Sequence, residues 1–323
     1  MYKRQVIAVA ALIYVYTNLS FVNNGNRLKL KSGGDIYEVY CGKWVGKFFN
    51  YFSALFCYMS FVVMCGGANS TAIEQWGLPN GAGAVILTVL VVVTAIAGLN
   101  GIVKTLGVLG PVIILLIIFV SLYSAIAGWD NLSAGIVAVD THKYAITQVG
   151  DGNPFASGAS YGGFVILWFA AFLGGIGAKH DKKEVNAGMI LSAFAIFAVA
   201  AVCCLALIAN IDMTWNAGVP AITLASSIHP WLAEAFAVII FIGIYTSACP
   251  LLWTGIRKLS NEGTGKYKWL TIVGGALGCV IACYVPYRPL LNVIYGLNGY
   301  LGFILVAFMI VNDVRVWKAS KLN

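Results

Sequence analysis

The polar residues best placed to do chemistry lie close together in one apolar run, residues 232–253. Gly243, Tyr245, Thr246 and Ser247 are near its middle. If the run crosses a membrane, hydroxyls at that depth have no water and must bond a backbone carbonyl, a neighbouring helix or an ion. The oxygens of Thr246 and Ser247, with the Gly243 carbonyl one turn earlier, form a set of hard ligands that suits a cation such as Na⁺. The alternative is that both hydroxyls bond to their own helix one turn back, as Ser and Thr in membrane helices usually do.

A second candidate segment is the run 161–178, where Gly174 and Gly175 follow Phe169 and Phe172. Glycine can leave a helix without a steric penalty, and the end of a half-helix directs its dipole at a charged substrate. A break here would place the two phenylalanines beside the substrate. The alternative is that the glycines let neighbouring helices pack closely.

The run 48–67 carries a polar face and, beside it, Tyr58. The residues of that face are Asn50, Ser53, Cys57 and Ser60. Their spacing places them on one side of a helix, so we expect them to point into the protein. Tyr58 then either contacts the substrate or makes a hydrogen bond between helices.

The remaining reactive side chains do not form a catalytic or metal-binding pattern. His142, His180 and His229 all fall between the apolar runs, and on both sides of the expected membrane, so they cannot form one metal site. Seven of the eight cysteines lie within apolar runs, where they are expected to be small buried thiols. The sequence contains no phosphate-binding loop or zinc-protease motif. We therefore expect neither an enzyme nor a bound cofactor or metal.

Carboxylates near the apolar runs are few, and the two that stand out lie close to the ends of their runs. Glu234 comes at the start of the run 232–253, and Glu74 follows the run 48–67. Both are shallow enough to reach water, so a simple outer-face role is expected, with proton coupling or gating as the alternative. No acidic or basic residue is expected at mid-membrane, which favours Na⁺ as the coupling ion and leaves H⁺ possible.

The composition identifies the elements that must position these residues. Of the 323 residues, 60% are hydrophobic and only 10% are charged, which excludes a soluble globular protein, a disordered chain and a nucleic-acid-binding module. Nine apolar windows have the length of about 17 to 22 residues that a helix needs to cross a bilayer. They are 6–22, 48–67, 82–99, 106–127, 161–178, 187–208, 232–253, 269–285 and 290–311. The sequence predicts an all-α polytopic membrane protein with nine transmembrane helices.

The basic residues predict the orientation of these helices. If the loops alternate sides, 16 of the 20 Lys and Arg residues fall on one side, which is the cytoplasmic side by the positive-inside rule. The C-terminal tail, 312–323, is then cytoplasmic. The odd number of spans would place the N-terminus outside, with Lys3 and Arg4 on the unexpected side. Residues 1–5 match the peptide that a common sequencing adapter would encode, so we expect an N-terminally truncated chain that lacks one preceding helix.

A five-plus-five inverted repeat has ten helices, of which the first and the sixth are broken at mid-membrane. The nine predicted spans and the one missing span add up to that number. Three segments, 32–49, 63–79 and 218–259, carry a closer likeness. Together they resemble the YkvI-type bacterial membrane proteins, a branch of the amino acid/polyamine/organocation superfamily with the LeuT fold. The resemblance runs from Val6 to the C-terminus.

The resemblance implies a LeuT-type repeat without its first helix. Residues 6–127 would hold the rest of the first repeat, 128–160 an outer loop, and 161–311 the second repeat. The family's sodium site on its eighth helix would correspond here to Gly243, Thr246 and Ser247.

The candidate substrate contacts come from three runs. They are Tyr58, Phe169, Phe172, Gly174, Gly175 and Tyr245. The segment 219–225 is amphipathic enough to form a short helix, either a lid over the vestibule or a simple cover for a turn between helices.

By this resemblance the protein is a secondary active transporter of a small organic solute, an amino acid above all, in the bacterial plasma membrane. Its partners would be a small-molecule substrate and the lipid bilayer, with no nucleic acid. Transport would be sodium-coupled and would proceed by alternating access. The alternative is a nutrient sensor that keeps the transporter fold and binds its ligand without moving it. Fold-level likeness alone does not decide between them.

Overall fold

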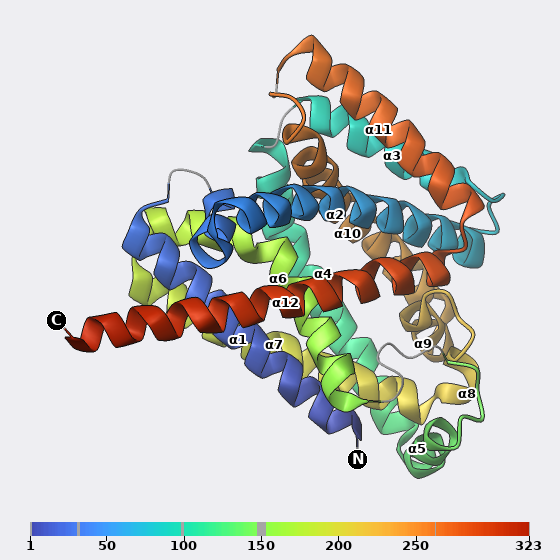
Figure 1. Cartoon of the computed structure of the whole chain (residues 1–323). Helices are drawn as coiled ribbons and strands as arrows, with labels where there is room; N and C mark the ends of the chain where they lie inside the picture. Colours follow the sequence, from blue (N-terminus) through green and yellow to red (C-terminus); the bar gives the residue numbers. More distant parts are fainter. Residues whose placement is uncertain (1, 31–32, 98–99, 147–152, 262, 323) are drawn as a thin grey trace. The chain divides into compact units, whose positions relative to one another are not determined.

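The structure of the protein is a computed structural model, and it describes residues 2–30, 33–97, 100–146, 153–261 and 263–322. Every regular element in these ranges is a helix. Figure 1 shows the helices in chain order, coloured from blue to red. The predicted all-α class is therefore confirmed.

The helices have the following bounds. They are α1 (Tyr2–Leu28), η1 (Gly33–Asp35), α2 (Ile36–Trp76), α3 (Ala82–Ala97), α4 (Asn100–Ala127), η2 (Trp129–Asn131), α5 (Leu132–Asp140), α6 (Pro154–Lys179), α7 (Lys182–Ala209), α8 (Ile211–Thr214), α9 (Pro220–Ile228), α10 (Pro230–Arg257), α11 (Gly265–Tyr284) and α12 (Tyr287–Leu322).

Several of these helices are long and apolar enough to cross a membrane. Within the described ranges six helices meet that condition, and a seventh span is counted if a bent pair is taken as one. The pair is Val112–Ala127 with Trp129–Asp140, bent by 69°. Two further apolar helices, Ala82–Ile96 and Ile166–Ala178, are shorter. The chain thus has the helices of a multi-pass membrane protein.

Local sequence explains where the helices begin. α10 starts with Pro230, whose fixed φ suits a first helical turn, and the His229 ring accepts a hydrogen bond from the Trp231 amide at 3.2 Å. Thr264 caps α11, where its hydroxyl accepts from the Tyr267 amide at 3.1 Å. The short helix expected over 219–225 is present as α9.

The chain divides into two compact units. Unit 1 comprises Met1–Phe56, Gln148–Phe197 and Asn292–Asn323, and unit 2 comprises Cys57–Thr147 and Ala198–Leu291. In unit 2, α11 lies along α3 (Figure 1), and α10 packs against α3, α4, α9 and α11.

In unit 1, α1 packs along the length of α6, and glycines allow the close approach. Gly158 lies opposite Val6, and Gly174 lies opposite Gly25, so the two helices run in the same direction. A Cβ atom at Gly25 would overlap the Gly174 carbonyl. The glycines of α6 therefore serve close packing, the alternative that the sequence left open.

The one break inside a long helix of unit 1 with described geometry lies in α2, at Gly42. This residue has φ 72° and ψ 178°, which is non-helical and in the region that favours glycine. A Cβ there would meet nothing within 4 Å. By contrast α6 is helical throughout Pro154–Lys179, so the unwinding predicted at Gly174 and Gly175 does not occur in this structure.

Candidate functional site

The predicted site residues fall in both units. Phe169, Phe172, Gly174 and Gly175 lie on α6 in unit 1. Tyr58, Gly243, Tyr245, Thr246 and Ser247 lie in unit 2, the first on α2 and the others on α10. Each group is therefore described within its own unit.

On α10, Thr246 bonds to its own helix one turn back. The Thr246 side chain is 2% exposed, and its hydroxyl donates to the Gly243 carbonyl at 3.0 Å. This is the bond to the helix's own chain that the sequence offered as the alternative. It brings two of the three predicted oxygens within 3.0 Å, and the Thr246 oxygen keeps lone pairs that could bind a cation. Ser247 follows at once and is half-buried.

Tyr245 and Tyr58 make hydrogen bonds between helices of unit 2. The Tyr245 hydroxyl lies 2.6 Å from the Thr94 hydroxyl, which itself donates to the Leu90 carbonyl at 2.7 Å, so Tyr245 is the donor to Thr94. Tyr58 donates to the Gly274 carbonyl at 2.9 Å. Both tyrosines thus connect helices, and neither lines the cavity of unit 2 described below.

On α6, Phe169 packs into an apolar cluster rather than into a cavity. The cluster contains Ala10, Tyr14, Ala193 and Phe197. Phe172 is on the same helix, but its side chain lies outside the described residues. Gly174 lies against Gly25 of α1, as described above. The structure therefore assigns packing contacts to Phe169 and Gly174.

Unit 2 contains a cavity of about 440 Å³. Its lining comes from α2, α4, α7, α9, α10 and the start of α12, and it includes Gly67, Ser121, Cys203, Gly218, Val219, Pro220, Ala221, Leu224, Phe236, Ile240, Ile244 and Tyr287. The wall is mostly apolar, with a few polar groups such as the Ser121 hydroxyl, 3.1 Å from the Cys203 sulfur. Small-molecule sites commonly have this character, with volumes of roughly 300–1,000 Å³.

One wall of this cavity is α9, and a carboxylate holds the two residues that precede it. Glu74 accepts hydrogen bonds from the amides of Gly218, at 2.8 Å, and Val219, at 3.2 Å. A negative charge is favourable at the N-terminus of a helix, where the amides have no partner within the helix. We call this contact the Glu74 latch.

The second of the two carboxylates singled out by the sequence lies on α10. Glu234 accepts from the Trp76 indole at 3.0 Å, and the Trp76 ring also lies against Phe241, with ring centroids 5.8 Å apart. Glu74 and Glu234 are both exposed, and each accepts hydrogen bonds from unit 2. Both carboxylates thus connect elements of unit 2, and the outer-face role stays a prediction.

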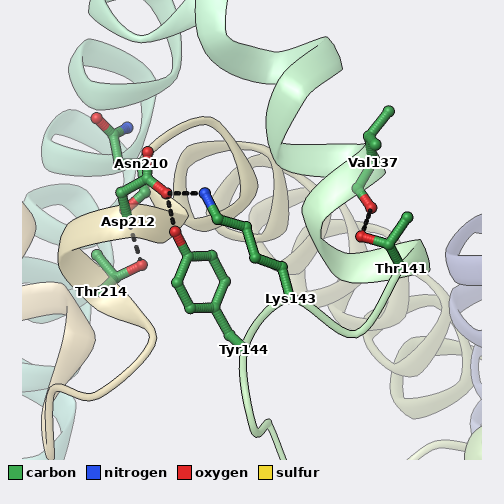
Figure 2. A network of polar contacts seen from close by, with 7 residues as sticks. All are labelled: Val137, Thr141, Lys143, Tyr144, Asn210, Asp212 and Thr214. Atoms are coloured by element: carbon green, nitrogen blue, oxygen red, sulfur yellow. Dashed lines mark hydrogen bonds and ion pairs between the residues drawn. The ribbon is translucent and has the colours of Figure 1, made fainter.

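A polar cluster ties the segment after α5 to α8, as Figure 2 shows. Tyr144 donates a hydrogen bond to the Asp212 carboxylate, and the Lys143 ammonium lies 3.7 Å from the same group. The Tyr144 ring stacks on Trp215, with centroids 5.3 Å apart. The Tyr144 hydroxyl, and then the Asp212 charge, raise the pKa of Lys143 above the usual lysine value. Lys143 therefore stays charged at neutral pH.

Unit 1 contains a buried polar network that the sequence analysis missed, centred on Asp313. Its carboxylate accepts from Ser20 at 2.5 Å, from Tyr16 at 3.1 Å and from Asn24 at 3.2 Å. The Tyr40 hydroxyl joins the network at 2.8 Å from Ser20 and 2.9 Å from Asn24. Donors from α1 and a tyrosine from α2 thus surround a carboxylate of α12.

A signal for this network was present in the sequence. Tyr16, Ser20 and Asn24 recur at every fourth residue, which places them on one face of a helix. Asp313 was assigned to the tail 312–323, but α12 continues as a helix to Leu322. The apolar pattern ends near residue 311 while the helix does not, so the window placed the carboxylate outside the helix.

No group of three His, Cys, Asp or Glu side chains in the described ranges could hold a metal ion. The chain matches no protein-family model, and a search of curated proteins gives no match. Any functional conclusion therefore depends on the geometry of the two units.

Proposed function

We propose that the protein is a secondary active transporter of a small organic solute, an amino acid or a close analogue, driven by sodium through alternating access. The observation that carries the proposal is the cavity of about 440 Å³ in unit 2. It is a partly open hollow lined by membrane-type helices and by α9, and two hydrogen bonds hold the start of α9 to Glu74. A cavity of this kind suits a solute. The α9 wall also packs Ile222, Leu224 and Ala225 into the apolar core of unit 2, so we infer that α9 moves together with the helices it contacts.

The proposed architecture is the LeuT-type five-plus-five inverted repeat of the amino acid/polyamine/organocation superfamily, with nine spans that correspond to helices two to ten. In that arrangement α10 is the eighth helix. The proposed location is a bacterial plasma membrane, with the C-terminus in the cytoplasm. This orientation rests on the side of the membrane that holds 16 of the 20 basic residues.

The proposed sodium site consists of Gly243, Thr246 and Ser247. The support for it is the 3.0 Å contact that already brings the Thr246 hydroxyl to the Gly243 carbonyl, at a side chain that is 2% exposed. Oxygen ligands without charge suit Na⁺ better than a proton, which needs a titratable group. H⁺ is the alternative coupling ion.

Sodium-dependent stability tests this site. A ligand at ten times its Kd stabilises the folded state by about 1.4 kcal/mol, so saturating NaCl should raise the Tm of the purified protein relative to choline chloride at equal concentration. The double substitution Thr246→Ala with Ser247→Ala should abolish that rise, because it removes two of the three oxygens.

The matched control is Thr254→Ala on the same helix. The Thr254 hydroxyl donates to the Pro250 carbonyl at 2.7 Å, so it makes the same kind of bond outside the proposed site. This variant should keep the sodium response. An equal sodium response in the double variant would exclude these residues as the site.

A further inference from the structure

Unit 1 contains a second hollow, an open groove of about 680 Å³ between the start of α2 and the second half of α12. Its α2 wall runs from Glu38 to Gly42, and its α12 wall runs from Phe303 to Arg315. Neither wall belongs to the proposed transport site. The groove is therefore a candidate for binding a different ligand.

The α12 wall of the groove changes from apolar to polar along its length. It starts at Phe303 and Ile304 and ends at Asn312 and Arg315. From residue 303 to 315 a helix rises about 18 Å. One leaflet of a bilayer contributes about 15 Å of the ~30 Å hydrocarbon core. The wall thus has the length and the polarity gradient of one phospholipid in one leaflet.

The apolar part of this wall is open rather than covered by the protein. Phe303 is 51% exposed, and Val311 is 49% exposed. In a helix that can cross a membrane, exposed side chains of this type contact acyl chains. Hydrocarbon is therefore the expected contact of this surface.

The polar end of the groove presents two opposite charges. Glu38 and Arg315 both line it, and they form no ion pair with each other within the described part of the chain. A guanidinium binds a phosphate through parallel hydrogen bonds, and a carboxylate accepts from an ammonium. The two charges together match a headgroup that carries a phosphate and a primary amine.

The floor of the groove is held rigidly. The Tyr40 ring is 6% exposed, and its hydroxyl is tied to Ser20 and Asn24 in the Asp313 network. Next to it, the backbone break at Gly42 leaves open space where a side chain would otherwise stand. A site with a fixed floor loses little entropy when a ligand binds.

Two exposed tryptophans indicate where the polar end of the groove lies relative to the membrane surface. Trp44 is 84% exposed, two residues beyond Gly42. Trp317 is 56% exposed, two residues beyond Arg315, and the Lys321 ammonium lies 3.9 Å from its ring centroid. Exposed tryptophans paired with lysines are typical of the membrane–water interface. The charged end of the groove thus lies where lipid headgroups are found.

We propose that this groove is a binding site for a phospholipid with a phosphate and a primary amine, of the phosphatidylethanolamine class. The phosphate binds at Arg315, the ammonium binds at Glu38, and one acyl chain lies along Phe303 to Phe308. The site is separate from the proposed transport cavity, so its test does not depend on transport.

Thermal unfolding of delipidated protein in detergent tests the site. We expect palmitoyl-oleoyl phosphatidylethanolamine to raise the Tm at least about two-fold more than the matching phosphatidylcholine, whose quaternary amine cannot donate a hydrogen bond to Glu38. An equal rise with both lipids, or a larger rise with phosphatidylglycerol, would overturn the proposal.

Three variants locate the binding on the groove. Arg315→Gln should abolish the rise with both lipids, and Glu38→Gln should remove the preference for the primary amine. Ala307→Trp should fill the apolar part and abolish binding without removing a charge.

Two controls keep this test decisive. Lys318→Gln removes an exposed cation of α12 outside the groove, and Ala276→Trp adds the same bulk on an exposed face of α11. Both should respond to lipid as the unchanged protein does. Retained lipid preference in Arg315→Gln and Ala307→Trp, with folding checked by circular dichroism, would contradict the site.

Discussion

Asp313 joins α12 to α1 in unit 1 through hydrogen bonds of its carboxylate. Its carboxylate receives three donors, from Tyr16, Ser20 and Asn24, and each hydrogen bond to a charged group contributes roughly 1.5–3 kcal/mol. A carboxylate at the edge of an apolar region is costly without such partners. The network thus stabilises the approach of α12 to α1.

The first prediction concerns Asp313→Asn. The amide cannot accept from all three donors at once, because its nitrogen is itself a donor, so we expect a loss of about 2 kcal/mol or more. Thermal unfolding of the purified protein measures this as a lower Tm. Asp140→Asn, the same change at an exposed carboxylate, is the control and should leave the Tm unchanged. Equal Tm values for the two variants would show that the network does not stabilise unit 1.

At the residue scale the sequence predicted some contacts and missed others. It placed Thr246 within bonding distance of the Gly243 carbonyl because i, i−3 geometry is a property of the helix itself. It could not pair Asp313 with Ser20, which is 293 residues away along the chain, because only the tertiary fold brings them together. Sequence spacing predicts contacts within one or two turns of a helix. The Asp313 network depends on contacts between residues far apart in the chain.

At the scale of elements, α1 and α6 depend on glycines for their close contact. A Cβ at Gly25 would overlap the Gly174 carbonyl, and one at Gly177 would overlap the Val22 carbonyl. Backbone atoms cannot move aside as a flexible side chain can. The helices would have to separate to admit a methyl group, which would weaken their packing along the whole contact.

The second prediction is that Gly25→Ala lowers stability. Overpacking typically costs 1–3 kcal/mol, and we expect a value of about 2 kcal/mol, seen as a lower Tm. Gly188→Ala is the matched control, since a Cβ there meets nothing within 4 Å in α7. That change should be neutral or stabilising by about 0.5–1 kcal/mol, because alanine favours a helix. A Gly25→Ala protein as stable as Gly188→Ala would argue against close packing of α1 on α6.

The third prediction concerns the Glu74 latch. In Glu74→Gln the charge that favours the N-terminus of α9 is lost, and one of the two acceptor oxygens becomes a donor. We expect hydrogen exchange at the amides of Gly218 and Val219 to become faster by about five- to ten-fold, which corresponds to roughly 1–1.4 kcal/mol. Mass spectrometry of peptides covering α9 measures this exchange.

The control for the latch is Glu184→Gln, the same change at an exposed carboxylate in the first turn of α7. Its α9 peptides should exchange at the normal rate. Unchanged exchange of α9 in Glu74→Gln would mean that Glu74 does not hold the helix.

The positions of the helices could largely be predicted from the sequence. The positions at which a helix is interrupted could not. Each of the nine apolar windows falls within a helix or overlaps one in the described ranges. The break, however, lies at Gly42, whereas the sequence offered a break at Gly174 and Gly175 as one of two alternatives. A glycine permits either a break or a close contact, and the presence of a partner backbone decides between them. Gly174 has α1 against it, whereas Gly42 has open space.

At the scale of the whole molecule, composition alone predicted a multi-pass helical protein. The fraction of 10% charged residues and the apolar windows suffice for that class. The division into two units was not predictable in the same way. Unit 1 combines three segments that are far apart in the chain, and contacts such as Tyr40 with Asn24 assemble only after the helices pack.

We propose that the protein moves a solute across a membrane in response to a sodium gradient. Uptake of a radiolabelled mixture of amino acids into proteoliposomes tests this most directly, with NaCl outside and choline chloride inside. We predict uptake above that of protein-free vesicles, lost when the gradient is dissipated and reduced in Thr246→Ala with Ser247→Ala. Stabilisation of the protein by an amino acid without any uptake would contradict transport and would identify a sensor that binds its ligand without moving it.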